Sequence, residues 1–510
     1  MDDPPGQHDN TVTKPSICIP DILYIICSLL DVKDIRRFRV CCHAFAAAAA
    51  PFVHRRLVIY PHKRDLAMLK QLSLDPVVAP NVRTLVWIGH VLPRPKLDLD
   101  TFSRQFEGAR AMKRMVNDLR ARHGIASSAV LQPFQNGQSL VALTPTGRTP
   151  AETAALQLDD VKTMYREYTE TLVEQDFMFA HDLDTAALGE AVRRFTSLRE
   201  FTFSSYWEFA TQGARTPFDK CLVFPGPTPS PRGTRETVAF LEALAAVRSN
   251  NPSAVKLESL TLGLLSWRFF EEEKAVLGRA LETCRDLTTF RICIDTGMKE
   301  PGNLAGRDHD DDDDDLDEVN LDPLGLGHRH QPDDHDGFGT EVLECARVMS
   351  TGMLRNFLIC LENLENLQVS FLYNSVNLDF PARLDDVIQP KHRWEYLTTL
   401  KLENISTERQ ELLAVLKRHK DTLEALSLHN IALRNTSWLV LLPQIRKTLT
   451  GLVSASMDGE LFGWDERYDM EEYWNLGRDG YGAELRFDLN RYLKSQVIKT
   501  CPLSRDNNEA

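Results

Sequence analysis

The stretch TLEALSLHNIALRNTSWLVLLPQI, residues 422–445, carries the pattern that decides the fold. Its apolar residues Leu423, Leu426 and Leu428 follow one another at intervals of three and two. The interval of two between Leu426 and Leu428 is typical of a strand, because alternate side chains of a strand lie on one face. The preceding run ERQELLAVLKRHK, residues 408–420, has leucines three and four residues apart, which indicates a helix. Together the two patterns predict a helix followed by a strand.

The same apolar spacing recurs along most of the chain. Six more complete copies of it are Val82-x-x-Leu85-x-Trp87, Leu198-x-x-Phe201-x-Phe203, Leu257-x-x-Leu260-x-Leu262, Leu287-x-x-Phe290-x-Ile292, Leu364-x-x-Leu367-x-Val369 and Leu397-x-x-Leu400-x-Leu402. A weaker copy starts at Leu449-x-x-Leu452. Copies that lie close together start 26 to 33 residues apart, near the period of about 20–29 residues that is typical of leucine-rich repeats. One repeat of this kind cannot bury its apolar face alone, so we expect neighbouring repeats to stack.

Helical patterns also precede other copies of this spacing, namely GEAVRRF at 189–195, VAFLEALAAVRSN at 238–250 and AVLGRALETC at 275–284. The run LVIY at 57–60 indicates the first strand. Helix and strand in alternation over residues 57–500 predict an irregular leucine-rich-repeat-like α/β solenoid. The alternative is a generic α/β domain in which the leucines fall into this spacing by chance, because single copies of the pattern are common.

Three segments interrupt this array. Residues 131–150 and 223–234 combine Pro, Gly and Ser or Thr, which favour loops. Residues 303–339 contain a run of six aspartates that starts at Asp310. Because these carboxylates repel one another and cannot pack, we expect a disordered acidic insertion there.

Other segments fall outside the repeat pattern. Helical patterns at 102–122 and 155–180 predict an all-α element between the first two complete copies. The two ends of the chain, residues 1–15 and 501–510, are polar, and we expect them to be disordered tails.

The charge of the chain is unevenly distributed. Residues 307–336 hold 13 acids and 2 bases, a net charge of −11 out of the formal −14, so the remainder is near −3. No basic stripe stands out, and we therefore expect no nucleic-acid partner.

The apolar run Ile17–Leu30 has 14 residues, short of the roughly 20 that a membrane-spanning helix needs. We expect no membrane partner and a cytoplasmic or nuclear location.

Motifs that carry catalysis do not occur in the sequence. Ten cysteines are scattered without a CxxC pair, which favours free thiols in a reducing compartment over disulfides or a zinc site. GxSxG, GxGxxG, GxxxxGK[ST] and HExxH are all lacking. Cys41 and Cys42 precede His43, but neighbours in a helix do not face one another, so packing is the favoured role.

The acidic insertion holds four histidines among its carboxylates, namely His309, His328, His330 and His335. A solvated charge run explains them better than a metal site, and we expect no catalytic residue, metal or cofactor.

The N-terminal region reads as three short helices. Residues 19–30 form the first pattern, with Pro20 in its first turn, where a missing N–H costs nothing. Asp31 can cap the second helix, and 44–50 gives the third.

The first of these helices is unusually apolar. Ile22, Ile26 and Leu29 share one face, flanked by Leu23 and Leu30. Three helices in about 35 residues cannot bury so many apolar side chains among themselves. Two interpretations stay open on these grounds: the helices cap the solenoid, or they present an apolar face to another protein.

The same residues resemble a known family. Ile19-Pro20-Asp21-Ile22-Leu23, then Ile26, Leu29-Leu30, Asp34, Arg37, Val40-Cys41 and Phe45 are similar to an F-box. The exit APFVHRRLVI, residues 50–59, and the repeats that follow resemble fungal F-box proteins with leucine-rich-repeat-like bodies. The resemblance places an F-box at 16–56 and the repeat body at 57–500.

An F-box implies a non-catalytic role in protein degradation. It would dock on the Skp-type adaptor of a cullin–RING ubiquitin ligase, while the repeats hold an as yet unknown protein substrate. The residues that the resemblance assigns to docking are Pro20, Ile22, Leu23, Ile26, Leu29, Leu30, Val40 and Cys41. The alternative is a repeat scaffold with no ubiquitin role, in which the first helices would be buried against the repeats.

Overall fold

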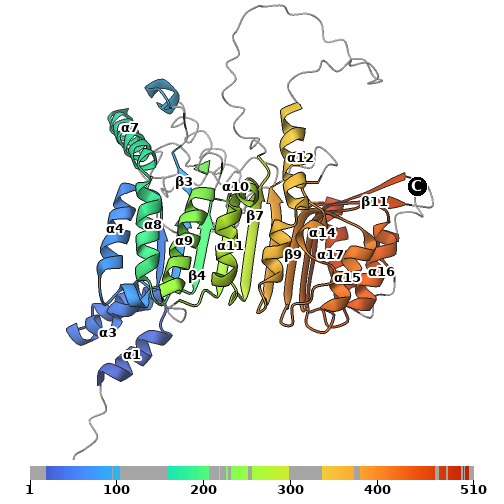
Figure 1. Ribbon diagram of the computed structural model, residues 1–510, viewed down its shortest axis with the longest axis horizontal. Helices are drawn as coiled ribbons and strands as arrows, with labels where there is room; N and C mark the ends of the chain where they lie inside the picture. Colours follow the sequence, from blue (N-terminus) through green and yellow to red (C-terminus); the bar gives the residue numbers. More distant parts are fainter. Residues whose placement is uncertain are drawn as a thin grey trace, which may run out of the picture.

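The chain builds one α/β body around a single large sheet (Figure 1). The computed structural model describes residues 19–92, 94, 96–103, 158–205, 217–218, 226–227, 231, 233–250, 255–297, 336–372, 380–465, 470–477, 480–495, 498 and 500–504. The predicted loop at 131–150, the tail at 1–15 and most of the acidic insertion lie outside these residues.

Within the described residues, ten strands form this sheet, and their order in the sheet follows their order in the chain. They are β1 (Arg56–Ile59), β2 (Thr84–Ile88), β4 (Glu200–Ser204), β6 (Ser259–Ser266), β7 (Thr289–Asp295), β8 (Asn366–Leu372), β9 (Thr399–Thr407), β10 (Ala425–Leu433), β11 (Ser454–Asp465) and β12 (Met470–Leu476). All neighbours pair in parallel except β11 and β12. The α/β class and the strand expected at 57–60 are therefore confirmed.

The register of the sheet explains the repeated spacing in the sequence. The central apolar residue of each complete copy lies opposite that of the next. This buried row consists of Leu85, Phe201, Leu260, Phe290, Leu367, Leu400 and Leu426. Leu57 of β1 extends it at one end and Ala455 of β11 at the other. The spacing read from the sequence thus marks the strand positions that face the core.

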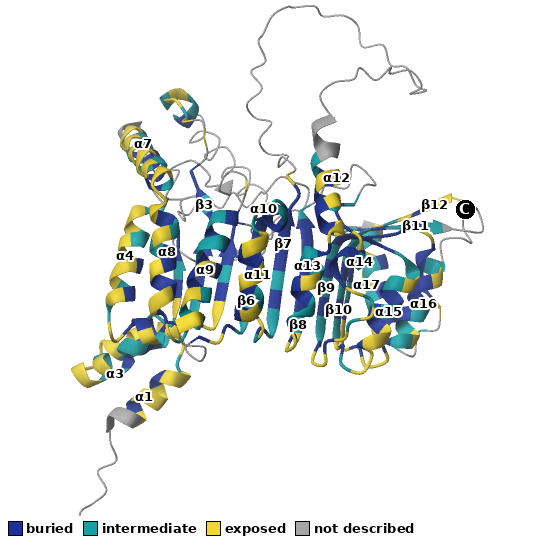
Figure 2. Ribbon diagram, viewed as in Figure 1, coloured by how far each residue is buried: buried dark blue, intermediate teal, exposed yellow. Residues whose placement is uncertain are grey.

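Helices cover one face of the sheet (Figure 1). The longer ones are α4 (Lys63–Leu74), α8 (Leu183–Arg194), α9 (Thr234–Asn250), α11 (Lys274–Thr283), α13 (Met353–Ile359), α15 (Arg409–Arg418), α16 (Trp438–Thr448) and α17 (Gly480–Lys494). Short helices are α10 (Phe269–Glu272), α14 (Leu384–Val387) and the 3-10 turn η1 (Ala79–Asn81). The four helices expected ahead of strand copies are confirmed as α8, α9, α11 and α15. The apolar sides of helices and strands form one continuous core, which Figure 2 shows in dark blue.

The weakest sequence copy has a different register from the expected one. Ala455 pairs with Leu426, so Leu452 takes the position that Leu423 has in the preceding copy. Leu449 instead follows α16 as its C-cap residue. Two leucines three residues apart fit the pattern equally well, and only strand pairing separates them.

Two asparagines tie four neighbouring strands together. Asn404 and Asn430 adopt left-handed backbone angles, with φ of 58° and 49°, which asparagine tolerates better than most residues. The Asn404 amide donates to the Phe371 carbonyl at 2.6 Å, and the Asn430 amide donates to the Asn404 side chain at 2.9 Å. The backbone N–H of Glu460 donates to the Asn430 side chain at 2.7 Å. Both asparagines follow a leucine pair at the same position of copies 26 residues apart, a signal that the sequence analysis missed.

A second, smaller core lies on the other face of the sheet near β2. Val86 and Ile88 project from that face and pack against α7 (Leu158–Ala180), through side chains such as Tyr168. This helix confirms the one predicted at 155–180. Of the helix predicted at 102–122, only residues 102 and 103 are described, and they are helical. A two-stranded sheet of β3 (His90–Val91) and β5 (Gly226–Pro227) lies outside the main one.

Two expected boundaries differ from the structure. The last four residues of the predicted acidic insertion, 336–339, belong to helix α12 (Asp336–Ser350), whose apolar side packs on the main core through Cys345 and Val348. The residues of η4 (Pro502–Ser504) were expected in the C-terminal tail. Leu503 is buried in the main core instead, so the folded body continues to Ser504.

Candidate docking surface

Three helices precede the sheet at one end of the molecule. They are α1 (Ile19–Leu29), α2 (Val32–Arg39) and α3 (His43–Val53). Both α1 and α2 pack on α3, and α1 lies at the outside of the body below α3 (Figure 1). The three short helices expected from the sequence are therefore present.

Helix α1 has apolar residues on two opposite sides, and only one of them is covered. Leu23 is 7% exposed and Cys27 is fully buried, and these two lie one turn apart on the inner side. The outer side carries four aliphatic residues at the spacing of a single helical face. They are Ile22 (43% exposed), Ile25 (58%), Ile26 (39%) and Leu29 (82%). We call these four residues the α1 stripe; α1 is largely yellow in Figure 2.

The inner side of α1 belongs to a small core of its own. Cys27 packs with Ile35 of α2 and with Phe52 of α3, and Leu30 packs half-buried against this cluster. The ring of Tyr24 meets that of Phe52 edge-on at 4.7 Å between centroids. Burial raises the pKa of the Cys27 thiol, which keeps it protonated and suits it to apolar packing. The cluster is already filled, so it leaves the α1 stripe uncovered.

Helix α2 starts and ends as its sequence dictates. The Asp31 side chain accepts a hydrogen bond from the Asp34 backbone N–H at 2.7 Å, which is the expected N-cap. At the other end Val40 is 85% exposed, and Cys41 and Cys42 are exposed free thiols. Val40 lies eight residues, about 12 Å along a helix, beyond the start of α2, so it and Leu29 lie at opposite ends of this helix.

The structure divides the residues predicted for docking into groups. Ile22, Ile26 and Leu29 lie together on the α1 stripe, and Val40 and Cys41 are exposed at the far end of α2. Leu23 is buried instead, and Leu30 packs half-buried against the core of α1–α3. Pro20 lies in the first turn of α1, and its side chain is outside the described part.

Sequence reasoning missed Ile25 and also Val32, which is 37% exposed at the start of α2. Ile25 is three residues after Ile22 and four before Leu29, so helical spacing alone could have placed it on the stripe. The inner and outer sides of α1 are both apolar, and hydrophobicity could not decide which of them faces α3.

The helical triplet joins the sheet without a linker. The Arg55 side chain lies over the Phe52 ring at 4.1 Å, a cation–π contact that closes α3. The Arg55 carbonyl accepts hydrogen bonds from the backbone N–H groups of Arg83 and Thr84, at 2.8 and 2.9 Å. Since β1 begins at the next residue, the position of the triplet is tied to that of the sheet.

The face of the sheet opposite the helices offers a second surface. One row of residues crosses it in register from β4 to β11. The row consists of Thr202, Thr261, Arg291, Gln368, Lys401, Ser427 and Ser456. Arg291 donates to the Gln368 side chain at 2.8 Å, and Lys401 lies 3.6 Å from the Glu403 carboxylate. The row is polar and carries both signs of charge, unlike the aliphatic α1 stripe.

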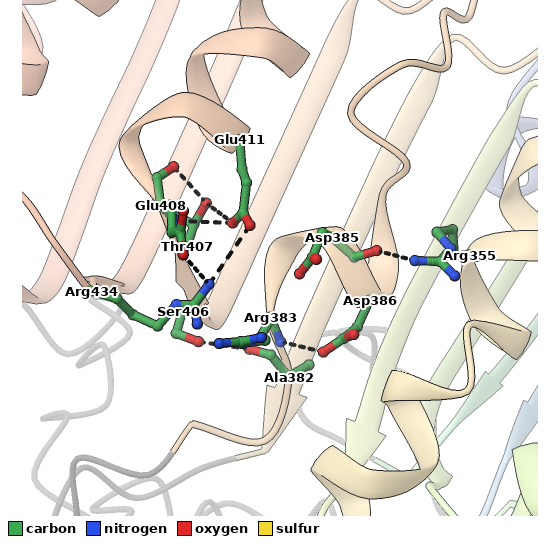
Figure 3. A network of polar contacts seen from close by, with 10 residues as sticks. All are labelled: Arg355, Ala382, Arg383, Asp385, Asp386, Ser406, Thr407, Glu408, Glu411 and Arg434. Atoms are coloured by element: carbon green, nitrogen blue, oxygen red, sulfur yellow. Dashed lines mark hydrogen bonds and ion pairs between the residues drawn. The ribbon is translucent and has the colours of Figure 1, made fainter.

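A polar network at the carboxyl ends of β9 and β10 is shown in Figure 3. Arg434 pairs with Glu408 at 3.1 Å and with Glu411 at 3.7 Å. The Glu411 carboxylate also accepts from the Glu408 backbone N–H at 2.9 Å and so caps α15. Burial, then the nearby Asp385 and Glu408 carboxylates, raise the pKa of Glu411. These contacts hold the start of α15 to the residue that follows β10, and we assign the network a structural role.

In the described part of the chain, no group of three or more His, Cys, Asp or Glu side chains is arranged to hold a metal ion. Among the helices of these residues, none combines the length and the apolar character needed to cross a bilayer.

Comparison with known proteins adds no family to this geometry. No protein-family model matches the sequence, and no curated protein matches it.

Proposed function

We propose that this protein is a substrate-recognition adaptor of a Skp–cullin–F-box ubiquitin ligase. In this proposal α1–α3 are an F-box that docks on a Skp-type adaptor, which links the chain to the cullin. The sheet and its helices are an irregular leucine-rich-repeat-like solenoid that binds a protein substrate. The protein itself catalyses no step, and it brings the substrate to the ligase.

The α1 stripe is the observation that carries the proposal. Four aliphatic side chains share one helical face, and Leu29 is 82% exposed at its end. Burying aliphatic surface releases about 25 cal/mol per Å², so a partner groove that accepts this face would gain several kcal/mol. A helix with its apolar face in a groove is a recurrent mode of protein recognition. The F-box resemblance of the same residues supports a Skp-type adaptor as that partner.

The polar strand row supports substrate binding on the body. Parallel strands that follow chain order place one side chain per repeat along a continuous line, and repeat proteins use such lines as extended binding surfaces. Residues such as Arg291 and Lys401 can offer hydrogen bonds and charge to a polypeptide.

The alternative function, a repeat scaffold with no ubiquitin role, required the first helices to be buried against the repeats. Leu23 and Cys27 are buried, but Cys27 packs within α1–α3 and not against the repeats, and the stripe on another side of α1 is exposed. The stripe therefore favours the adaptor over the form of scaffold described above.

A binding experiment with matched substitutions tests the adaptor function. The full-length protein and a purified Skp-type adaptor are mixed, and complex formation is measured by calorimetry. Leu29→Asp places a charge on the most exposed side chain of the proposed contact, and we expect it to weaken the complex at least 100-fold, about 3 kcal/mol. Val453→Asp makes a matched change at a side chain that is 72% exposed on the repeat body, and we expect it to bind like the wild type.

A third variant separates docking from folding. Leu23→Asp puts a charge on the covered side of α1, and we expect it to unfold the triplet, as seen by loss of helical circular dichroism. Leu29→Asp should keep the wild-type spectrum. A wild-type protein that does not bind the Skp-type adaptor, or a Leu29→Asp variant that binds it normally, contradicts the proposed function.

A further inference from the structure

Helix α2 exposes several bases that form no ion pair with an acidic residue in the described part of the chain. Lys33, Arg36 and Arg39 are exposed, and among the described residues no carboxylate forms an ion pair with any of them. Arg37 of the same helix pairs with Asp34 at 3.2 Å, so it is neutralised locally. Unpaired surface cations next to one another repel, and a fold keeps them there at a small cost in stability. We call Lys33, Arg36 and Arg39 the basic triad.

The positive potential extends from α2 towards the sheet. Burial lowers the pKa of His54, which follows α3, and the charges of Arg39 and Arg36 lower it further, against the opposite effect of Asp75. Arg83, exposed before β2, acts on Arg55 in the same way. Residues 19–56 contain six Lys and Arg against three Asp, although the whole chain has a formal charge of −14. This end of the protein is therefore basic within an acidic molecule.

Apolar side chains are interspersed with these bases. Val32 precedes Lys33 and is 37% exposed, and Val40 follows Arg39 and is 85% exposed. The α1 stripe ends at Leu29, only four residues before Lys33. Duplex nucleic acid offers phosphates but no groove for aliphatic side chains at this density, and its readers rely on polar and basic contacts. A folded protein offers both carboxylates and an apolar groove, so it is the better match.

We infer that the partner of the α1–α3 surface is an acidic protein, whose apolar groove receives the α1 stripe and whose carboxylates face the basic triad. This inference rests on the proposed docking function and names the chemistry of the partner at that same surface. The stripe supplies most of the stability of the complex, because the removal of its aliphatic surface from water is favourable. The triad accelerates and orients the encounter, because charges outside the apolar contact act mainly on the association rate.

Association kinetics with a Skp-type adaptor test this division of roles. The triple variant Lys33→Gln/Arg36→Gln/Arg39→Gln removes three positive charges while keeping good helix-forming residues. We expect its association rate constant to fall on the order of 10-fold at low ionic strength and to approach the wild-type value in 0.5 M NaCl, where the Debye length is about 4 Å. The dissociation rate should change little.

A matched triple variant on the body controls for net charge. Lys256, Lys391 and Lys420 are exposed lysines of the repeat region, and their change to Gln removes the same charge far from α2. We expect this variant to associate at the wild-type rate. Equal slowing in both triple variants, or a wild-type rate that does not depend on salt, overturns the inference while Leu29→Asp can still support docking.

A probe that does not depend on any Skp-type adaptor completes the test. A fluorescently labelled 20-residue polyglutamate peptide should bind the wild-type protein weakly at low salt, with an anisotropy change that the α2 triple variant abolishes and the body variant retains. Absence of such binding overturns an acidic partner whether or not the adaptor binds. Tighter binding of a random DNA duplex than of the peptide, lost in the α2 variant, also overturns it, because the triad would then be a phosphate contact.

Discussion

The repeat body and the N-terminal triplet use apolar residues in opposite ways. In the body each strand contributes alternate side chains to a core that the helices cover. Leu426 and Leu428, for example, lie on the apolar face of their strand and are buried. In the triplet α1 is apolar on two sides, and its neighbours cover only the side of Leu23 and Cys27. Figure 2 shows the contrast, with dark blue strands in the body and a largely yellow α1.

This difference shows where an apolar side chain indicates a binding site. It does so only where no other element of the fold is placed to cover it. A strand in the middle of the sheet has another strand on each side, so its leucines report on packing between neighbouring strands and helices. The triplet has the sheet on one side only, and the α1 stripe lies on its outer side. Surface aliphatic residues grouped on one helix face are typical of interaction sites, whereas single ones are normal.

The largest test of this contrast compares two leucines. Leu428 is buried in β10, and Leu428→Ala should lower the free energy of unfolding by about 2–5 kcal/mol through lost burial and the cavity left behind. Leu29 is 82% exposed on the stripe, and Leu29→Ala should change the same quantity by less than about 0.5 kcal/mol. Urea unfolding followed by circular dichroism measures both.

The two variants should show the reverse order in binding. Leu29→Ala should weaken the complex with a Skp-type adaptor, and Leu428→Ala should leave it unchanged below its unfolding transition. If Leu29→Ala destabilises the protein as much as Leu428→Ala does, the stripe belongs to the core and the contrast between the two regions is lost.

A buried carboxyl group contributes to the pH dependence of the body. Glu236 in the first turn of α9 is 2% exposed, and burial, together with the nearby Asp184 carboxylate, raises its pKa to about 7. The nearby Arg235 makes its ion pairs with Asp182 and Asp184, at 2.7 and 3.1 Å. The folded state therefore holds a proton that the unfolded state, with a pKa near 4.5, releases. Stability from this group is complete below pH 4.5, is lost as the pH rises towards 7, and is constant above that.

Glu236→Gln isolates this contribution, since the amide resembles the protonated acid. We expect the variant and the wild type to have similar unfolding free energies at pH 4.5, and the variant to be more stable by roughly 3 kcal/mol at pH 8. Buried histidines titrate in both proteins, so subtracting one unfolding free energy from the other cancels their contribution. His419 is one of them: burial lowers its pKa, and its effect on stability has the opposite pH dependence to that of Glu236. A constant difference across this pH range contradicts a titrating Glu236.

The sequence determined most of the body but little of its finer connections. Leucines at intervals of three and two predicted the strands of the parallel sheet, because alternate side chains of a strand lie on the one face that the helices bury. The start of the last copy was placed at Leu449 and lies at Leu452, since both residues fit the spacing and strand pairing decides between them. The bonds between Asn404 and Asn430 depend on that pairing and could only be suspected from their equivalent positions.

The candidate docking surface was predictable in composition and less so in orientation. The apolar excess of α1 and the cap at Asp31 follow directly from the residues. Leu23 was expected on the docking face and is covered instead, while Ile25 was overlooked and is exposed. A helix that is apolar on both sides gives no local signal for its orientation, which is set by the ring of Phe52 on α3.

The smallest expected effect tests whether the triplet opens independently of the body. Cys27 is buried among α1–α3, so its labelling by a thiol reagent, followed by mass spectrometry of its peptide, reports on opening of the triplet. Asp31→Ala removes the cap of α2 and should destabilise that helix by about 1 kcal/mol, which is roughly a five-fold faster labelling of Cys27. Asp31→Asn preserves a cap, and Cys27 of this variant should be labelled at nearly the wild-type rate.

The urea midpoint of the body should not move in either variant, because the core of the triplet is separate from the main core. A parallel shift of the midpoint and of Cys27 labelling would mean that triplet and body unfold as one unit. The exposure of the α1 stripe would then have to be maintained by the whole fold, and the α1–α3 surface could not adjust to its partner without loosening the repeats.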